Sequence, residues 1–285
     1  MVQREDVRLD VATAAARRAL VVDASWVYPP LNAAGIDVRA RYREAHVPGA
    51  VFLDLAALSP PRPADVAAIA PPTPASLRAA LAAIGQGPDD PVIVTDQDGG
   101  VGTAPFARLA LLDAGFADVR LLDGGTPAWA AAGRALTAEG ARIVAAPKVD
   151  APAGGGRFVD TAATRRALAN GSAAVVDARF VPTNEGVLPA RFAEVAIPAT
   201  AVLRPGEVIE ETVDGARFKD APALRALAVA RGLAPGRPVI VTCHFGVGAA
   251  VVATALELAG VADVRVDRDS VLGWAALNPR AGSAR

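Results

Sequence analysis

The chain has 285 residues, and 52% of them are hydrophobic, which is enough to bury a core in one large domain or in two ordinary ones. Its 29 lysines and arginines nearly balance its 30 aspartates and glutamates, and no basic stripe with interleaved aromatic residues appears, which argues against nucleic-acid binding. The most apolar stretch, 246–256, is shorter than the ~20 residues that span a bilayer, and residues 1–10 lack the apolar run of a signal peptide. We therefore expect a globular, cytoplasmic protein without nucleic-acid or membrane partners.

The first half of the chain alternates strand and helix signals. "LVVDAS" (20–25) and "PVIVT" (91–95) are short runs rich in β-branched residues, typical of strands buried on both faces. Between them, "TPASLRAALAAIG" predicts a helix with Thr73 as its N-cap, Pro74 at its first position and an end at Gly85. Strands that alternate with helices predict an open parallel sheet flanked by helices.

The second half repeats the first half in the same order, about 150 residues later. The repeated blocks are "LVVDAS" (20–25) and "AVVDAR" (174–179), "ARYREAHVPGA" (40–50) and "ARFAEVAIPAT" (190–200), "DPVIVTDQDGGVGTA" (90–104) and "RPVIVTCHFGVGAA" (237–250), and "AGFADVRLLD" (114–123) and "AGVADVRVDR" (259–268). This period is too long for a solenoid. We predict two copies of one α/β domain, at 1–140 and 157–285, joined by a Pro-, Gly- and Ala-rich linker at about 138–157.

The only cysteine, Cys243, follows the strand "PVIVT" (238–242) and begins the loop "CHFGVG", ahead of an Ala-rich helix that ends at Gly260. In a parallel α/β sheet, ligands bind beyond the carboxyl ends of the strands, where loops lead into helix N-termini. A single cysteine cannot form an internal disulfide, which fits a reducing compartment. The position favours a reactive thiol, and the alternative is a small, buried, inert side chain.

The energy needed to activate this thiol decides what the loop must do. Lowering a thiol pKa by two units takes about 2.7 kcal/mol. A helix N-terminus alone supplies about 0.3–1 kcal/mol. Two amide hydrogen bonds to a charged sulfur, at about 1.5–3 kcal/mol each, close the gap. Gly246 and Gly248 permit the backbone turns of such a cradle, so we expect an anionic sulfur at Cys243.

These motifs resemble the two-domain rhodanese-type sulfurtransferases, which comprise the thiosulfate and 3-mercaptopyruvate sulfurtransferases. The similarity covers nearly the whole chain and is clearest in "VVDASWV", "EAHVPGAVFLDL" and "LLDGGTPAW". It implies two tandem rhodanese-like domains, the first with Asp96 at the position where the second carries the catalytic Cys243. The active-site loop that it implies after Cys243 consists of His244, Phe245, Gly246, Val247, Gly248 and Ala249.

The resemblance also implies a reaction. A sulfane sulfur passes from a small anionic donor, 3-mercaptopyruvate or thiosulfate, through a persulfide on Cys243 to a thiol or cyanide acceptor. Backbone N–H groups would stabilise thiolate and persulfide alike, and neither a metal nor an organic cofactor is needed. Arg179 and Arg191 match arginines that bind the donor's carboxylate or sulfonate in the family. For each of them the alternative is a surface ion pair.

The loop departs from the family pattern "CGSGVTA". Phe245 replaces a hydroxyl residue, and Ala56 stands where the mercaptopyruvate branch has an aspartate, so the proton that a pyruvate enolate needs has no evident carrier. His244 is a partial substitute, because a pKa near 6.5 makes it a proton donor or a cation beside the thiolate; the alternative is a solvent-facing loop residue.

Four further residues have expected roles, two because they match the family motifs and two because they are tryptophans. Arg41 and His46 occupy first-domain positions of the same motifs, and we expect His46 to hold a loop in place. We expect Trp129 and Trp274 to pack in the core or between the domains.

Three other functional classes are less favoured than a sulfurtransferase. The degenerate loop is compatible with a catalytically silent pair of domains that binds or regulates, although retention of the only cysteine favours an enzyme. A phosphatase is disfavoured because Ala249 stands where its loop needs an arginine. Thiol-based redox sensing or arsenate-type reduction is disfavoured because the chain has no resolving cysteine.

Overall fold

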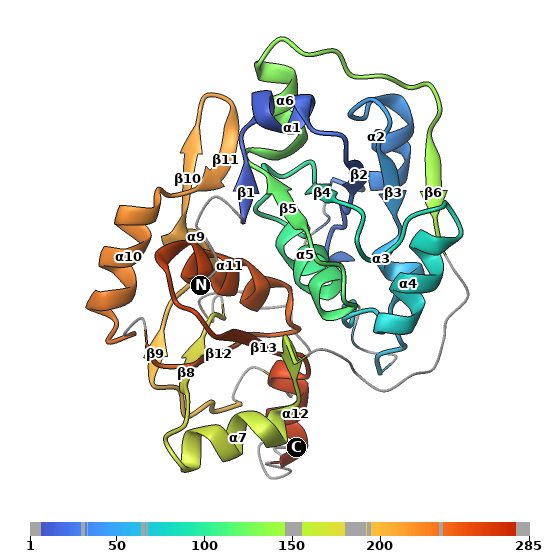
Figure 1. Cartoon of the computed structure of the whole chain (residues 1–285). Helices are drawn as coiled ribbons and strands as arrows, with labels where there is room; N and C mark the ends of the chain where they lie inside the picture. Colours follow the sequence, from blue (N-terminus) through green and yellow to red (C-terminus); the bar gives the residue numbers. More distant parts are fainter. Residues whose placement is uncertain are drawn as a thin grey trace.

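The computed structural model describes residues 7–29, 32, 34–63, 66, 68–145, 156–179, 192, 195–233 and 236–277 (Figure 1). These residues form two sheets of parallel strands with helices packed against them, which confirms the predicted α/β class. No helix in the described ranges has the length and apolar character of a membrane span.

The first sheet has six strands in the order β1-β5-β4-β2-β3-β6, and its neighbouring strands are parallel. They are β1 (Arg8–Leu9), β2 (Leu20–Asp23), β3 (Val51–Leu53), β4 (Val92–Thr95), β5 (Val119–Leu122) and β6 (Arg142–Val144). β6 comes from the stretch that was expected to be a linker. Because it pairs with β3, the first domain continues past the expected boundary at residue 140.

The second sheet has the strand order β7-β13-β12-β8-β9, again with parallel neighbours. Its strands are β7 (Phe158–Val159), β8 (Ala174–Asp177), β9 (Ala201–Val202), β12 (Val239–Thr242) and β13 (Val264–Asp267). Matching these strands one by one to β1 to β5 gives the same order in both sheets. The repeat in the sequence is therefore a repeat of topology.

The first-domain helices are α1 (Val11–Ala16), α2 (Val38–Glu44), α3 (Leu55–Leu58), α4 (Pro74–Ala82), α5 (Ala104–Asp113) and α6 (Gly125–Ala131). The predicted cap of α4 is confirmed, because Thr73 Oγ1 accepts a hydrogen bond from the amide of Ser76 at 3.1 Å. Leu77 and Leu81 on its inner face are fully buried. The chain leaves the helix through a turn that ends at Gly85, whose φ is +83°.

The described helices of the second domain are α7 (Thr161–Ala169), α9 (Pro205–Val208), α10 (Ala221–Ala230), α11 (Val247–Ala259) and α12 (Ser270–Leu277). α11 ends before Gly260, as predicted, but it starts at Val247. The loop after Cys243 is therefore shorter than "CHFGVG", and Gly248 lies inside the helix and not at a turn.

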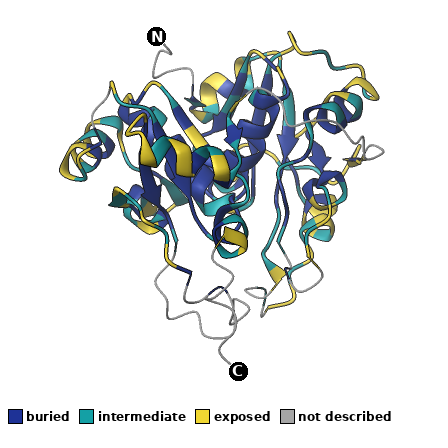
Figure 2. Cartoon of the chain, turned by 90° about the horizontal axis from the view of Figure 1, so that it is seen from below, coloured by how far each residue is buried: buried dark blue, intermediate teal, exposed yellow. Residues whose placement is uncertain are grey.

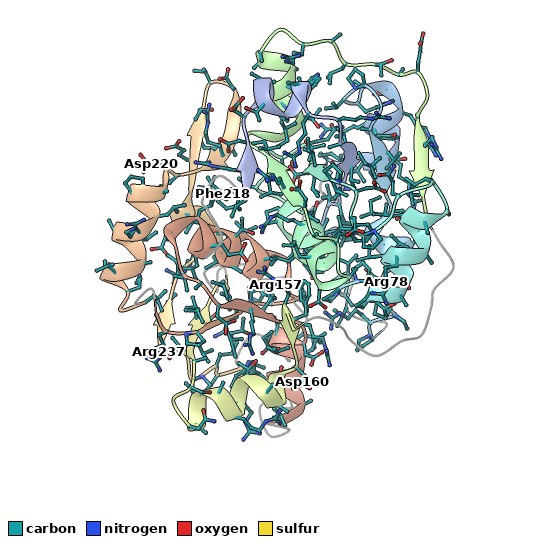
Figure 3. The ribbon with its side chains drawn as sticks, in the orientation of Figure 1. Arg78, Arg157, Asp160, Phe218, Asp220 and Arg237 are labelled. Carbon is teal, nitrogen blue, oxygen red and sulfur yellow. The ribbon has the colours of Figure 1, made fainter. Side chains whose placement is uncertain are left out.

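The two domains share one core. α5 and α11 pack side by side across the boundary, and one apolar cluster runs through residues of both sheets (Figures 1 and 2). Arg108 of α5 is buried and forms an ion pair with Glu257 of α11 at 2.6 Å. Glu257 also pairs with Arg157, which Figure 3 labels where the two domains meet.

A hairpin in the second domain extends to the first domain. It consists of the antiparallel strands β10 (Ile209–Thr212) and β11 (Gly215–Phe218). At its base, labelled in Figure 3, the carbonyl of Phe218 accepts a hydrogen bond from Arg8 of β1 at 3.2 Å. The hairpin therefore lies along the first domain, as Figure 1 also shows.

Candidate active site

Cys243 lies at the carboxyl end of β12, which is the middle strand of the second sheet. All four residues of β12 are buried. The chain turns at Gly246, which has a φ of +100°, and enters α11 at Val247. This turn directs the amide of Gly246 toward the sulfur, to which it donates a hydrogen bond at 3.1 Å. The predicted position after a strand and before a helix is confirmed.

A second turn holds the loop from the other side. The amide of Cys243 donates to Ser270 Oγ at 3.2 Å, and that hydroxyl donates to the carbonyl of Asp267 at 2.6 Å. The amide of Val271 donates to the carbonyls of Cys243 and His244, at 3.2 Å each. Ser270 has a φ of +48°, the only positive value among the described residues other than glycine. The sequence analysis missed Ser270, although it follows β13, the neighbour of β12.

The electrostatics of Cys243 differ from the expectation of an anionic sulfur. The residue is only 3% exposed and belongs to the apolar core cluster. Burial raises the pKa of the Cys243 thiol, and hydrogen bonds from the amides of Gly246 and Ala249 offset this only in part. The expectation was wrong because it counted the amides and omitted the cost of removing the thiolate from water. A raised pKa favours the neutral thiol at neutral pH.

In the first domain, the amides of the corresponding loop donate several hydrogen bonds to the side chain at its start. Asp96 follows β4 as Cys243 follows β12, and its carboxylate is completely buried. It accepts four backbone hydrogen bonds of 2.7 to 3.1 Å, from the amides of Asp98, Gly100, Gly102 and Ala104. A loop of this type therefore aims several main-chain donors at the side chain that begins it.

His244 is a neutral side chain at neutral pH. Burial, together with the nearby charge of Arg179, lowers its pKa to about 4. The imidazole is thus neither a cation beside the sulfur nor an acid that gives up a proton at pH 7. The side chain of His244 is partly exposed, so its environment lies between the core and the solvent-facing position given as the alternative.

Phe245 anchors the loop at the domain boundary. Its ring centroid lies 5.7 Å from that of Tyr28, which belongs to the first domain, and 6.4 Å from that of Phe192. The boundary cluster, as we name it, consists of Tyr28, Val66, Phe192, Val195, Phe245, Val271 and Trp274. The expected packing of Trp274 between the domains is confirmed, since Tyr28 and Val66 come from the other half of the chain.

Arg179 is engaged in an ion pair. Its guanidinium donates to both oxygens of Asp177, at 2.7 to 3.1 Å, and to the carbonyl of Val195 at 2.7 Å. This matches the alternative of an ion pair, although the influence of Arg179 on His244 places its charge near the loop. Arg191 lies outside the described residues, so its role in binding the donor stays a prediction.

The remaining expectations concern the first domain. His46 is buried, and its Nδ1 hydrogen-bonds to the carbonyl of Tyr42 at 2.8 Å while its backbone pairs with Thr137, so it holds a loop in place as expected. Trp129 packs in a first-domain cluster under Arg134, whose guanidinium lies 5.2 Å from the ring centroid. Arg41 is exposed.

Comparison with known proteins assigns the family. A family model described as the rhodanese-like domain matches residues 23–132. The chain is 35% identical over 229 residues to a Mycobacterium tuberculosis protein named as thiosulfate sulfurtransferase SseB, an alignment that covers 79% of this chain and 78% of that protein. The chain belongs to the rhodanese family of sulfurtransferases. It is also 31% identical over 256 residues to the 3-mercaptopyruvate sulfurtransferase of Escherichia coli, with 84% of each chain covered.

Structural comparison agrees with this assignment. The crystal structure of SseA from Escherichia coli, described as a 3-mercaptopyruvate sulfotransferase with the rhodanese fold, matches with a TM-score of 0.73 at 26% identity. The match covers 92% of this chain and 98% of that chain. The resemblance stated from the motifs is therefore confirmed, for the family, for the fold and for the class of enzyme.

Proposed function

We propose that this rhodanese takes a sulfane sulfur from a small anionic donor onto Cys243 and passes it to a thiol or to cyanide. Cys243 reacts as the thiolate, its minor form at neutral pH, after the thiol loses its proton to solvent. The thiolate attacks the outer sulfur of the donor, the bond from that sulfur to the rest of the donor breaks, and the remainder leaves with the bonding electron pair. The observation that supports this most directly is the Gly246 amide, which donates to the Sγ of Cys243 at 3.1 Å. An acceptor then attacks the terminal sulfur of the persulfide and restores the thiolate.

The residues around the sulfur favour thiosulfate over 3-mercaptopyruvate. Sulfite leaves thiosulfate as a stable anion, whereas pyruvate leaves as an enolate that must be protonated. His244, with a pKa lowered to about 4, is neutral at pH 7, and Ser270 Oγ already donates to the carbonyl of Asp267. Because neither side chain is suited to supply a proton at pH 7, a donor that needs none fits this site better.

The wider proposal includes the surroundings of the site. The residues that follow Cys243, from His244 to Ala249, surround the sulfur from a short loop and from the first turn of α11, with Arg179 and Arg191 as further contacts of the donor and no cofactor. A single cysteine that works as a thiol suits a reducing compartment, so we propose that the protein acts in the cytoplasm without nucleic-acid partners.

Intact-mass measurement tests the proposal. The purified protein is incubated with thiosulfate, and separately with 3-mercaptopyruvate, and each sample is then treated with cyanide. We expect a gain of one sulfur atom that cyanide removes and that Cys243→Ser abolishes, with faster loading by thiosulfate. Absence of any gain with both donors would instead support the silent binding or regulatory module.

A further inference from the structure

Each domain sends one segment across to the other at the same point of the repeat. In the second domain this segment is the β10–β11 hairpin, which lies between α9 and α10. In the first domain the equivalent place, between α3 and α4, is taken by residues 59–73. The two segments therefore have equivalent positions in the two copies.

The hairpin packs directly on the Asp96 loop of the first domain. Gly99, in that loop, has a φ of +79°, and a Cβ added to it would lie 2.0 Å from the carbonyl oxygen of Ala216 in β11. The backbone of the second domain thus covers the loop whose amides already donate hydrogen bonds to Asp96. By the symmetry of the repeat, the described part of this segment, residues 59–63, 66 and 68–73, is expected to face the loop of Cys243.

Arg62 makes this reciprocal contact. Its Nη2 donates to the carbonyl of Arg268 at 2.9 Å, in the turn that leads to Ser270. The same carbonyl lies 3.9 Å from the place that a Cβ on Gly246 would occupy. The amide of Gly246 donates to the sulfur of Cys243. Gly246 therefore lies between the carbonyl that Arg62 binds and the reacting sulfur.

The guanidinium of Arg62 contains a buried donor without a partner in the described part of the chain. Its Nε has no hydrogen-bond partner among the described residues, and a buried unpaired N–H is costly to keep. Burial lowers the pKa of Arg62, and the charges of Asp269 and of a Cys243 thiolate oppose this, so the cation and the sulfur are close enough to interact.

Two carboxylates share this neighbourhood with Arg62. The Oδ1 of Asp269 lies 3.8 Å from the Nε of Arg268. The positive charge of Arg268 therefore balances the negative charge of Asp269 in part. Asp267 accepts hydrogen bonds from Thr161 and from the amide of Ser270. Both acids therefore have other partners. The neighbouring cation Arg268 lies 3.9 Å from Asp160 and 3.8 Å from Asp269, so the charge of Arg62 is available for an anion at the sulfur.

We propose that Arg62 is a substrate-binding residue that the first domain supplies to the active site of the second, where it binds the oxyanion end of the sulfur donor. This inference rests on the proposed sulfur transfer at Cys243. A sulfonate or carboxylate that bonds to the guanidinium satisfies Nε and places the outer sulfur of the donor next to Sγ. The site is then incomplete in either domain alone.

Alkylation by two probes of similar size tests the proposal without turnover. Iodoacetate is an anion and iodoacetamide is neutral, and both react only with Cys243 among thiols because the chain has no other. We expect Arg62→Ala to lower the ratio of the iodoacetate rate to the iodoacetamide rate by about tenfold, the factor that corresponds to ~1.4 kcal/mol. We expect Arg62→Lys to keep most of the ratio, because the charge remains.

Arg8→Ala is the matched control. Arg8 also donates from the first domain to a carbonyl of the second, that of Phe218, but at the hairpin and away from Cys243. It is expected to leave the ratio unchanged, so a general loosening of the domain boundary is separated from loss of the Arg62 charge. In the wild-type protein, sulfate is expected to slow iodoacetate more than iodoacetamide, a measurement that needs no variant.

The outcomes separate this inference from the proposed function. An unchanged probe ratio in Arg62→Ala, with an unchanged KM for thiosulfate, overturns the role of Arg62 even if the wild type forms a persulfide. A shifted ratio in a protein that accepts no sulfur from thiosulfate or 3-mercaptopyruvate keeps the anion site and overturns the sulfur transfer. If Arg62→Ala does not fold, Arg62→Gln and the sulfate measurement decide by the same criteria.

Discussion

The amide of Gly246 donates to the Sγ of Cys243 at 3.1 Å, and the backbone of Gly246 adopts a φ of +100° to do so. Side chains other than glycine rarely adopt this conformation. One residue thus fixes both the sharp entry into α11 and the donor at the sulfur. The chemistry of the site depends on this turn.

Gly246→Ala is expected to destabilise the fold by about 1–3 kcal/mol, because the backbone conformation is strained for alanine. Space is not the cause, since the nearest atom to an added Cβ, Cε2 of Phe106, is at an ordinary distance of 3.5 Å. Urea unfolding measures the loss, and alkylation of Cys243 should show a higher thiol pKa. Gly206→Ala is the control, because its φ is not positive and nothing lies within 4 Å of an added Cβ. Equal stability of the two variants would contradict the role of the turn.

The reactivity of Cys243 is expected to keep rising with pH beyond the range of an ordinary thiol. Burial raises the pKa of this thiol above its usual value, and only the thiolate reacts. The rate of iodoacetamide alkylation should therefore increase about tenfold per pH unit up to pH 9 without levelling off. The same cysteine in urea-unfolded protein should level off near ~8.5. A plateau below pH 8 in the folded protein would show that the amides outweigh burial.

His244 is expected to weaken the fold in acid. Its pKa is about 4 in the folded protein against 6.5 in the unfolded chain, so the unfolded state binds more protons between these values. The free energy of unfolding should fall as the pH drops from 6.5 to 4, by up to roughly 3 kcal/mol from this residue. Asp98 and Asp267, with pKa values raised to about 6, act in the opposite direction over the same range.

Comparison with His244→Gln isolates the histidine, because the two aspartates are present in both proteins. The difference in unfolding free energy between wild type and variant, measured by urea at several pH values, should change between pH 6.5 and 4 and be constant above pH 7. A constant difference over the whole range would mean that His244 is exposed to water in the folded protein.

The buried ion pair between the domains is expected to matter far more than a surface pair. Glu257→Gln leaves the charge of Arg108, whose side chain is 4% exposed, without its partner, at a cost of about 3–5 kcal/mol. Asp263→Asn, which breaks an exposed pair with Arg265, should change stability by less than ~1 kcal/mol. Urea unfolding of both variants tests this, and similar losses in the two would place the Arg108 pair in water.

Local signals in the sequence were sufficient for the elements and the position of the thiol. β-branched runs marked β2, β4, β8 and β12, and Thr73 with Pro74 marked the start of α4. The repeat supplied the topology, because two copies of one pattern fold into the same strand order. β6 was missed because its three residues lie in a stretch whose composition is typical of a linker, and only its pairing with β3 defines it.

The surroundings of the thiol depend on contacts that are distant in the sequence. Ser270 holds the loop of Cys243 through a separation of 27 residues, and Arg62 approaches it from the other domain. The thiol pKa was misjudged for the same reason: amide donors are local and visible in the motif, whereas burial is produced by the entire fold. Sequence patterns locate such a group but do not report its solvation.

The continuous apolar core makes the repeat functionally indivisible. A fragment that begins at residue 157 would have to expose to water the face of α11 that now lies on α5, along with the aromatic ring of Phe245. Duplication in this chain has thus joined the half that carries Cys243 to a half that shields it, and we expect that cutting between them does not yield a stable second domain.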